Sequence, residues 1–339
     1  MGPVRNQVRH TARNSAIRIV ETGTMITISV LGTGRIGTMH ADAIAAHPRA
    51  QLGPVFDTYE PSAQTVADRL GVAVSTPEAI FENPDVDAVL VASATPTHAD
   101  FIEQAVAAGK PILCEKPIDL SLERVNACAK AINGSDVPVQ IGFNRRFDPG
   151  HRAAYDAVQE GRAGEVHQVI ITSRDPELPP RGYMEAAGGF LRDMTIHDFD
   201  VARWMLGEEP VEVFATVNAK GDPALLAELD EVDTAMIIMR TASGKQCHIN
   251  NSRSATYGYD QRIEVLGSKG MVTSGNRKPH DMQFHDGNAA EVSTPYLHFF
   301  IERYRQAFIN EIDAFVDTAE NGAPVKASFE DGHRALILA

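Results

Sequence analysis

The chain has 339 residues, enough for about two domains of ordinary size. Hydrophobic residues make up 43% of it and charged residues 22%, a composition typical of a globular protein with a sizeable core. The net charge of −14 argues against a surface that binds nucleic acid or an anionic membrane, because both partners need clustered lysines and arginines.

The first 24 residues differ in composition from the rest of the chain. They carry four arginines against one acidic residue, Glu21, and contain no apolar run suited to a signal peptide. An Arg-rich, acid-poor start is also typical of an organelle transit peptide, but a strand pattern begins directly at Met25. We therefore interpret residues 1–24 as a flexible N-terminal extension.

Residues 25–146 alternate short apolar strands with helices. Strands are predicted at 26–32, 52–56, 86–93, 111–117 and 137–144, and helices at 36–48, 61–70, 98–108 and 122–132. Thr97 is the expected N-cap of the helix that begins at His98. Repeated β-α units of this length predict an α/β fold with a parallel, doubly wound sheet, that is, a Rossmann domain.

Residues 147–339 show a different pattern. After a helix at 151–160, segments with period-two alternation appear at 165–175, 210–219, 233–241, 245–253 and 261–267. A helix that contains residues 193–200 (DMTIHDFD) interrupts them, a long helix is predicted at 296–320, and the chain ends at Ala339 within a further helical pattern. This pattern predicts an α+β domain with a large open, mainly antiparallel sheet, one face of which is solvated or covered by another subunit.

A glycine-rich loop, Gly32-Thr33-Gly34-Arg35-Ile36-Gly37, lies between the first predicted strand and helix. Gly32 and Gly34 permit a tight turn and the close approach of a pyrophosphate, and Gly37 lets the helix pack on the strand. Asp57 follows the second strand 20 residues after Gly37, where a carboxylate accepts hydrogen bonds from the adenosine ribose. Because Thr58-Tyr59 offers no cation for a 2′-phosphate, the predicted cofactor is NAD rather than NADP.

The residues Cys114-Glu115-Lys116-Pro117 close another strand of the same predicted sheet. Ligands of such folds bind outside the carboxyl ends of the strands, so Lys116 is expected to project toward the cofactor. A lysine at that place can polarise a hydroxyl group or help to deprotonate it. The alternative interpretation is a surface lysine that follows a strand.

These motifs occur together with Thr95-Pro96-Thr97-His98, with residues 142–148 (GFNRRFD) and with the pair Asp193 and His197. In this combination the chain resembles the glucose–fructose oxidoreductase / inositol dehydrogenase family over nearly its whole length from Met25 onward. Residues 188–198 and 257–262 most resemble the inositol 2-dehydrogenases of that family. The resemblance implies an open-faced sheet domain behind the Rossmann domain, and a homotetramer formed through the open sheet face. The N-terminal extension and the early end at Ala339 depart from the family.

The resemblance also implies the site residues. The catalytic set that it implies is Lys116, Asp193 and His197. The predicted cofactor-binding residues are Gly32, Gly34, Arg35, Ile36, Gly37, Asp57, Thr95, Pro96, His98, Glu115 and Lys116. The predicted substrate-binding residues are Lys116, Asn144, Arg145, Asp193, His197 and Tyr257. For Asn144, Arg145 and Tyr257, a role as loop anchor or sheet-face residue is the alternative.

The catalytic set suits the oxidation of a secondary alcohol. Removal of the O–H proton needs a base with a pKa near the working pH, which histidine has. On a helix Asp193 and His197 share one face, so Asp193 is expected to orient the imidazole or to bind a neighbouring hydroxyl, and its charge to raise the basicity of His197. Lys116 is expected to stabilise the alkoxide that develops in the transition state.

The remaining polar and sulfur-containing residues point to no further site. Asp198 and Asp200 are interpreted as solvated helix residues or as charges near a helix N-terminus, rather than as catalytic groups. The other histidines are scattered without the i, i+4 spacing of metal ligands, so no metal site is predicted. Three cysteines without CxxC spacing favour a reducing, cytoplasmic compartment, and no stretch approaches the ~20 apolar residues of a membrane span.

The sequence therefore predicts an NAD-dependent dehydrogenase for a cyclic polyol, with myo-inositol and its 2-keto product (scyllo-inosose) as the leading pair. Another inositol isomer or an aldose is the alternative substrate, because a few side chains of the second domain decide the preference. A non-catalytic NAD-binding regulator and a glycosidase that uses NAD transiently are the other hypotheses. The intact Lys116 and His197 argue against the regulator.

Overall fold

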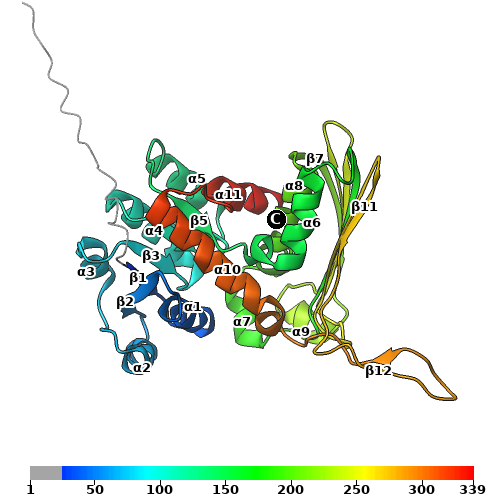
Figure 1. Cartoon of the computed structure of the whole chain (residues 1–339), viewed down its shortest axis with the longest axis horizontal. Helices are drawn as coiled ribbons and strands as arrows, with labels where there is room; N and C mark the ends of the chain where they lie inside the picture. The colour runs from blue at the N-terminus through cyan, green and yellow to red at the C-terminus, as the bar shows by residue number, and fades with distance from the viewer. Residues whose placement is uncertain (1–24) are drawn as a thin grey trace, which may run out of the picture.

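The N-terminal part of the chain forms a five-stranded parallel sheet in the computed structural model, which describes residues 25–339 (Figure 1). The strands are β1 (Ile26–Leu31), β2 (Ala50–Phe56), β3 (Ala88–Val91), β4 (Ile112–Cys114) and β5 (Val139–Ile141), in the order β2-β1-β3-β4-β5. The order changes direction between β1 and β3, which places a ligand crevice at the carboxyl ends of these two strands. The predicted doubly wound sheet is thus confirmed, whereas the predicted N-terminal extension lies outside the described residues.

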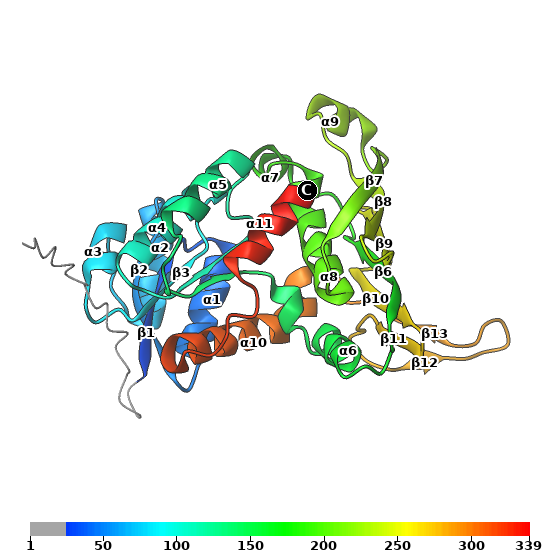
Figure 2. The same cartoon turned by 90° about the horizontal axis from the view of Figure 1, so that it is seen from above.

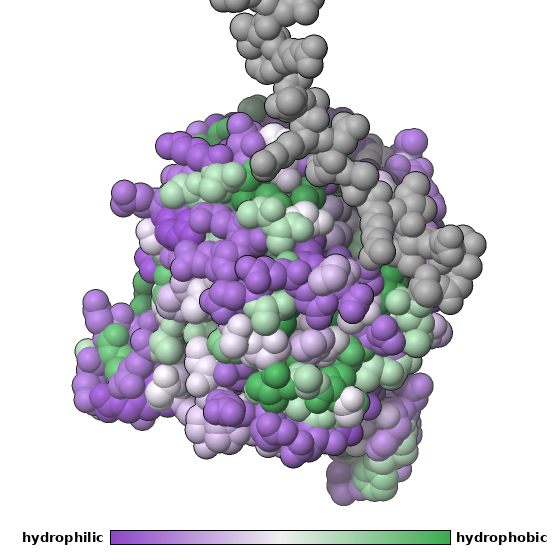
Figure 3. Space-filling model, turned by 90° about the vertical axis from the view of Figure 1, so that its left-hand side faces the viewer, coloured by the Kyte–Doolittle hydropathy of each residue, from purple (hydrophilic) through white to green (hydrophobic). Residues whose placement is uncertain are grey.

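Five helices connect and cover these strands. They are α1 (Arg35–Ala45), α2 (Glu60–Leu70), α3 (Pro77–Glu82), α4 (His98–Ala107) and α5 (Leu122–Ala131), of which only α3 was not predicted. Thr97 occupies the N-cap position of α4 as predicted, but its hydroxyl makes no capping hydrogen bond, because it donates to the Ala94 carbonyl instead (2.8 Å). The outer surface on this side of the molecule mixes hydrophilic residues with hydrophobic ones, which gather in a patch in the lower part of the view (Figure 3).

The second sheet has six strands in the order β11-β10-β6-β9-β8-β7. They are β6 (Val166–Arg174), β7 (Pro210–Asn218), β8 (Thr234–Thr241), β9 (Gln246–Ser252), β10 (Asp260–Gly267) and β11 (Gly270–Ser274). Every neighbouring pair is antiparallel except β6 and β9, which run parallel. The predicted open, mainly antiparallel sheet is therefore confirmed.

Helices cover only one face of this second sheet, as Figures 1 and 2 show from two directions. The covering helices are α6 (Pro149–Gln159) and α8 (Ile196–Leu206), and α8 packs on β6 and β9. The short helices α7 (Arg181–Ala186) and α9 (Pro223–Glu228) and the hairpin β12 (Gln283–Phe284) to β13 (Val292–Ser293) were not predicted. Within residues 25–339, the opposite face of the sheet carries no helix and presents its side chains outward.

The last two helices, α10 (Phe300–Asn321) and α11 (Phe329–Leu338), return to the first sheet. Phe315 of α10 belongs to the same buried cluster as Ile28 of β1, and α11 packs on β5. The predicted division after residue 146 therefore separates these helices from the sheet on which they pack. No helix of residues 25–339 is both long and apolar enough to cross a membrane.

Buried ion pairs join the two sheets at the turn η2 (Asn144–Phe147), which directly follows β5. Arg145 donates to Asp198 of α8 at 2.5 Å, and Arg146 binds Asp200 of the same helix through two hydrogen bonds of 2.8 and 2.6 Å. Next along the chain, Asp148 pairs with Arg303 of α10. These pairs fix both α8 and α10 to the end of the parallel sheet.

The interpretation of Asp198 and Asp200 as solvated residues was wrong, because both are fully buried. The physical reason is that α8 is packed from several sides, and ten of its eleven residues are buried. A helix with polar residues at buried positions shows no amphipathic stripe, so its sequence does not reveal that it is enclosed. Buried carboxylates of this kind require charged partners, which come from residues about 50 positions earlier in the chain.

Replacement of Asp200 by alanine is expected to destabilise the fold by about 3–5 kcal/mol, because it leaves the Arg146 guanidinium buried without its main partner. The measurement is the free energy of unfolding from urea titrations followed by circular dichroism. Glu185→Ala is the control, since Glu185 pairs with Arg181 on an exposed surface and its loss is expected to have no measurable effect. Equal losses in the two variants would contradict the role given to the buried pair.

Candidate functional site

The glycine-rich loop joins β1 to α1 at the crevice of the parallel sheet. Gly32 has a φ of +97°, and a Cβ built on it would lie 2.3 Å from the Ser93 backbone nitrogen. A Cβ on Gly37 would lie 1.8 Å from the Gly32 carbonyl oxygen, whereas a Cβ on Gly34 would meet nothing within 4 Å. The first N–H groups of α1 have no side-chain cap. The open space at Gly34 therefore fits a pyrophosphate that approaches uncapped N–H donors.

Asp57 lies at the carboxyl end of β2, beside this loop. Its Oδ2 accepts hydrogen bonds from the Thr33 backbone nitrogen (2.6 Å) and hydroxyl (3.2 Å), and its Oδ1 accepts from the Tyr59 backbone nitrogen (2.8 Å). The carboxylate is thereby held next to the glycine loop, at the place where the ribose of a dinucleotide binds in this type of fold.

Other residues predicted to bind the cofactor make contacts within the protein. The ring nitrogens of His98 lie 2.8 Å from the Pro117 carbonyl oxygen and 3.0 Å from the Ser93 carbonyl oxygen, so this buried ring joins the ends of β3 and β4. The Glu115 carboxylate lies 2.8 Å from His40 of α1. The Arg35 guanidinium lies over the Phe299 ring at 5.7 Å.

The remaining predicted cofactor positions follow the expected topology. Thr95 and Pro96 form a 3₁₀ turn (Thr95–Thr97) directly after β3, at the carboxyl edge of the sheet. Ile36 lies in the first turn of α1 and is partly buried. All of these positions surround the crevice between β1 and β3, where the fold binds its ligand.

Lys116 and Asp193 come together from different parts of the chain. The Lys116 ammonium group donates to the Asp193 carbonyl oxygen at 2.6 Å and to its carboxylate at 3.2 Å. Lys116 follows β4, and Asp193 lies in a π-helical turn (Leu191–Thr195) that leads directly into α8. The structure thus places two of the three predicted catalytic residues in direct contact at the carboxyl edge of the parallel sheet.

Two further residues, which the sequence did not reveal, bind the same carboxylate. The Tyr183 hydroxyl of α7 donates to Asp193 Oδ1 at 2.8 Å, and the Arg253 guanidinium donates to Oδ2 at 2.6 Å. Burial raises the pKa of Asp193, but the positive charges of Lys116 and Arg253 and the hydrogen bonds outweigh it and hold that pKa below its ordinary value. Asp193 is therefore an ionised carboxylate at neutral pH.

His197 lies one turn further along, in α8, with its ring edge-on to Phe143 at 6.0 Å. Its Nδ1 is buried, and the ring forms no hydrogen bond with any residue of the described chain, Asp193 included. The expectation that Asp193 orients this imidazole was therefore wrong. The π-helical turn explains the difference, because its wider winding moves Asp193 off the face that an α-helix would share with His197.

The basicity of His197 also differs from the prediction. Burial, followed by the positive charges of Lys116 and Arg145, lowers the pKa of His197 well below its ordinary value. The nearby Asp193 charge does not raise it, because Lys116 and Arg253 already compensate that carboxylate. His197 is accordingly a neutral imidazole at neutral pH, able to accept a proton.

Asp175 is another acidic residue of the site that the sequence did not reveal. It follows β6 directly, and its carboxylate lies 3.8 Å from the Arg253 guanidinium. Burial raises its pKa to about 6, although the Arg253 charge opposes this. Because Arg174 and Ser252 are paired across the parallel strands β6 and β9, the residues that follow them necessarily meet at one edge. That pairing would have revealed Asp175 and Arg253, but the order of the strands cannot be derived from the sequence.

The three other predicted substrate-binding residues have unequal surroundings. The Arg145 side chain is buried and donates hydrogen bonds to Asp198 and Ser173. These contacts agree with the alternative role of Arg145 as a loop anchor. The Tyr257 hydroxyl donates to Asp260 and accepts from Arg174, each at 2.8 Å. The side chain of Asn144 is buried and makes no hydrogen bond within the described chain, which leaves its amide available to a ligand.

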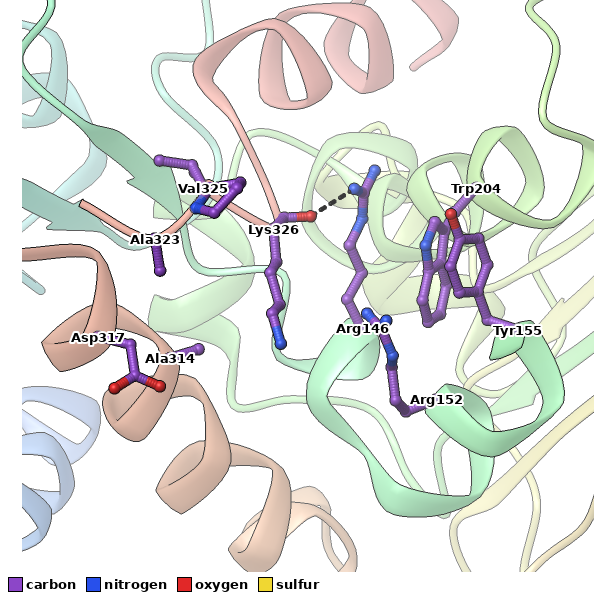
Figure 4. A pocket seen from close by; sticks show the side chains of 10 residues that line it. Arg146, Arg152, Tyr155, Trp204, Ala314, Asp317, Ala323, Val325 and Lys326 are labelled. Atoms are coloured by element: carbon purple, nitrogen blue, oxygen red, sulfur yellow. Dashed lines mark hydrogen bonds between the residues drawn. The ribbon is translucent and has the colours of Figure 1, made fainter. Parts of the chain in front are cut away.

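A separate hollow of about 400 Å³ lies on another side of α8 (Figure 4). Arg146, Arg152, Tyr155, Trp204, Asp317 and Lys326 are among the residues that line it. Arg146 donates to the Lys326 carbonyl oxygen across it, and the Tyr155 and Trp204 rings stack at 4.2 Å. None of Lys116, Asp193 and His197 lines this hollow, so it is distinct from the site at the sheet edge.

Comparison with known proteins covers both sheets. Residues 26–143 match the oxidoreductase family with an NAD-binding Rossmann fold, and residues 151–273 match the GFO/IDH/MocA C-terminal domain. The chain is 48% identical to the inositol 2-dehydrogenase of Rhizobium meliloti (strain 1021), over 93% of this chain and 94% of that protein. It is 41% identical to the myo-inositol 2-dehydrogenase of Thermotoga maritima, over 92% and 93%. The structure of scyllo-inositol dehydrogenase from Lactobacillus casei, with bound NAD(H) and scyllo-inositol, superposes with a TM-score of 0.84 at 29% identity, over 92% and 94% of the two chains.

Loss of the Asp57 carboxylate is expected to weaken NAD binding by about tenfold to a hundredfold, the range expected for hydrogen bonds to a charged group. NADP binding is expected to weaken less, because the repulsion between this carboxylate and a 2′-phosphate disappears with it. Isothermal titration of Asp57→Ala with both cofactors measures the ratio. Asp68→Ala, which removes an exposed carboxylate of α2, is the control. An unchanged preference for NAD over NADP would contradict the role of Asp57.

Proposed function

Because the chain belongs to the GFO/IDH/MocA oxidoreductase family, we propose that it oxidises myo-inositol to 2-keto-myo-inositol with NAD. The observation that carries the proposal is the contact of Lys116 with Asp193, one helical turn from a neutral His197, at the carboxyl edge of an NAD-binding sheet. The named relatives, inositol 2-dehydrogenases of 48% and 41% identity, support the substrate class.

The chemistry requires a hydride acceptor and a proton acceptor. Bound NAD, held at the glycine-rich loop and by Asp57, would supply the acceptor for the hydride of the carbon that carries the reacting hydroxyl, and that carbon would become a carbonyl. The hydroxyl proton passes to the neutral imidazole of His197, which releases it to solvent afterwards. Lys116 stabilises the negative charge that develops on the oxygen as the proton leaves.

Asp193 holds Lys116 in place for this step. Its carboxylate and carbonyl oxygens both accept from the Lys116 ammonium group, so the lysine is fixed between two acceptors on one residue. Tyr183 and Arg253 fix the carboxylate in turn. Such a preorganised charge needs no rearrangement during the reaction, which is the main source of electrostatic stabilisation in enzymes.

The test is the formation of NADH from NAD with a panel of myo-inositol, scyllo-inositol, glucose and other polyols. The expected result is turnover with myo-inositol, and a loss of at least a hundredfold in kcat for His197→Ala at nearly unchanged NAD affinity. Because the pKa of His197 is lowered, the base stays unprotonated to lower pH, and the rising limb of kcat/KM is expected below pH 6.5.

His167→Ala is the matched control, since this histidine is exposed on β6 and is not one of the residues of the proposed site. Its kinetics are expected to equal those of the wild type. Turnover with an aldose but with no inositol would reject the proposed substrate, and equal losses of kcat and NAD affinity in His197→Ala would assign that residue a structural role. Absence of NADH formation with every compound would favour the non-catalytic alternative.

We further propose that the open face of the second sheet joins subunits of a homotetramer. A row of side chains crosses four strands on this face: Phe214 pairs with Ile238, Ile238 with His248, and His248 with Ile170. Phe214, Ile238 and Ile170 are 67%, 54% and 38% exposed in the single chain. An apolar row of this kind on a sheet without covering helices is typical of a surface that another subunit covers.

Charge placed on this face is expected to dissociate the assembly. The double variant Phe214→Glu/Ile238→Glu is expected to sediment as dimers or monomers where the wild type sediments as a tetramer, because buried unpaired carboxylates oppose association. Analytical ultracentrifugation measures this. Ile309→Glu, at an exposed apolar position of α10, is the control that is expected to leave the assembly intact. A wild-type chain that sediments as a monomer would reject the proposal.

The compartment is part of the same proposal. Cys114, Cys128 and Cys247 are all buried and free of disulfide bonds. Burial raises the pKa of each thiol, which keeps the sulfur protonated and unreactive. Three such thiols support a reducing, cytoplasmic environment.

A further inference from the structure

A cluster of three ionisable side chains lies at the end of β4, between α1, β4 and α10. It consists of His40, Glu115 and Glu311, each of which offers one ligand atom, and these three atoms lie within 4.8 Å of one another. His40 Nε2 is 2.8 Å from a Glu115 oxygen, and the edge of the His40 ring packs on Phe308 of α10. The three residues are 75 and 196 positions apart, so no local spacing in the sequence indicates that they meet.

The burial of this cluster leaves polar atoms without partners. His40 and Glu311 are fully buried. Both carboxylate oxygens of Glu311 and the Nδ1 of His40 accept or donate no hydrogen bond within the described chain. Unpaired buried carboxylates are among the costliest groups in a protein interior, so both oxygens require a positive partner or a proton.

The charge of the cluster also favours a bound cation. Ionised together, the Glu115 and Glu311 carboxylates carry two negative charges in one buried cluster. Lys116 is turned away toward Asp193, and no other cation is bonded to these carboxylates in residues 25–339. A single divalent cation would balance both charges.

We propose that His40, Glu115 and Glu311 bind one divalent transition-metal ion, with Zn²⁺ as the best-fitting representative. One imidazole nitrogen and two carboxylate oxygens form a three-residue ligand set of the kind that Zn²⁺ accepts, with water at the fourth position. Glu115 is 17% exposed, and its side is where the ion enters and the water binds. The ligand atoms already lie within 4.8 Å of one another, and binding would draw them in to distances of about 2.0–2.2 Å from the ion.

The role of this ion is structural. It ties together α1, which begins at the cofactor loop, the end of β4, which carries Lys116, and α10, which comes from the end of the chain. The site lies outside the contact between Lys116 and Asp193 and takes no part in the proton transfer. The proposal is therefore independent of the substrate assigned above.

The experiment uses the full chain, stripped of metal by dialysis against a chelator and then titrated with Zn²⁺. We expect one Zn²⁺ per chain by mass spectrometry of the metal, and a melting temperature that rises with the Zn²⁺ concentration because the folded state alone holds the assembled site. Glu311→Gln, which keeps the shape and removes the charge, is expected to bind Zn²⁺ at least tenfold more weakly and to lose the rise in melting temperature.

Glu302→Gln is the matched control, since Glu302 is an exposed glutamate of the same helix. It is expected to bind Zn²⁺ as the wild type does, which separates the buried site from binding to surface carboxylates. The alternative is that Glu311 carries a proton in place of an ion, and glutamine then mimics it. A wild type that binds no more Zn²⁺ than Glu311→Gln, with equal melting temperatures, would overturn the proposal. If Glu311→Gln does not fold, the wild-type stoichiometry decides, and a wild-type chain that retains no Zn²⁺ at saturating Zn²⁺ would overturn the proposal.

Discussion

The buried ion pairs between η2 and α8 are the constraint on which the rest of the structure depends. Arg145 and Arg146 leave the last parallel strand and meet Asp198 and Asp200 inside the protein. Charges without water must be paired, so α8 has only one rotation and one axial position that satisfy both arginines. His197 is the neighbour of Asp198 in that helix. The same pairs that join the two sheets therefore also set the direction in which the base points.

The site combines a fixed negative charge with a neutral base a few residues apart. Asp193 stays ionised because Lys116 and Arg253 surround it, and His197 stays neutral because burial and the charges of Lys116 and Arg145 disfavour a further positive charge. Asp193 and His197 lie on one continuous helical segment. The π-helical turn directs Asp193 toward Lys116, whereas the α-helical residues that follow hold His197 away from Asp193. The DMTIHDFD segment therefore carries an aspartate that holds the lysine and a histidine that acts as the base.

Most of the fold and the cofactor side could be predicted from the sequence. The β-α alternation, the glycine loop and Asp57 are local features, and the structure agrees with them because a strand, its turn and its helix are neighbours in the chain. The predictions failed where the environment comes from distant residues. Asp198 was interpreted as solvated, because its partner Arg145 lies 53 positions earlier in the chain.

The sequence by itself determined the parallel sheet and the dinucleotide loop, because these follow from hydrophobic period and glycine spacing. It pointed to the catalytic set through the resemblance of its motifs to a known family. Only the tertiary structure decided which residues hold that set and in what protonation state. Arg253 and Asp175 reach the site because β6 and β9 pair, and the pKa of His197 falls because the packed helices exclude water from it. Burial and charge proximity are properties of the assembled chain, and no local pattern of residues encodes them.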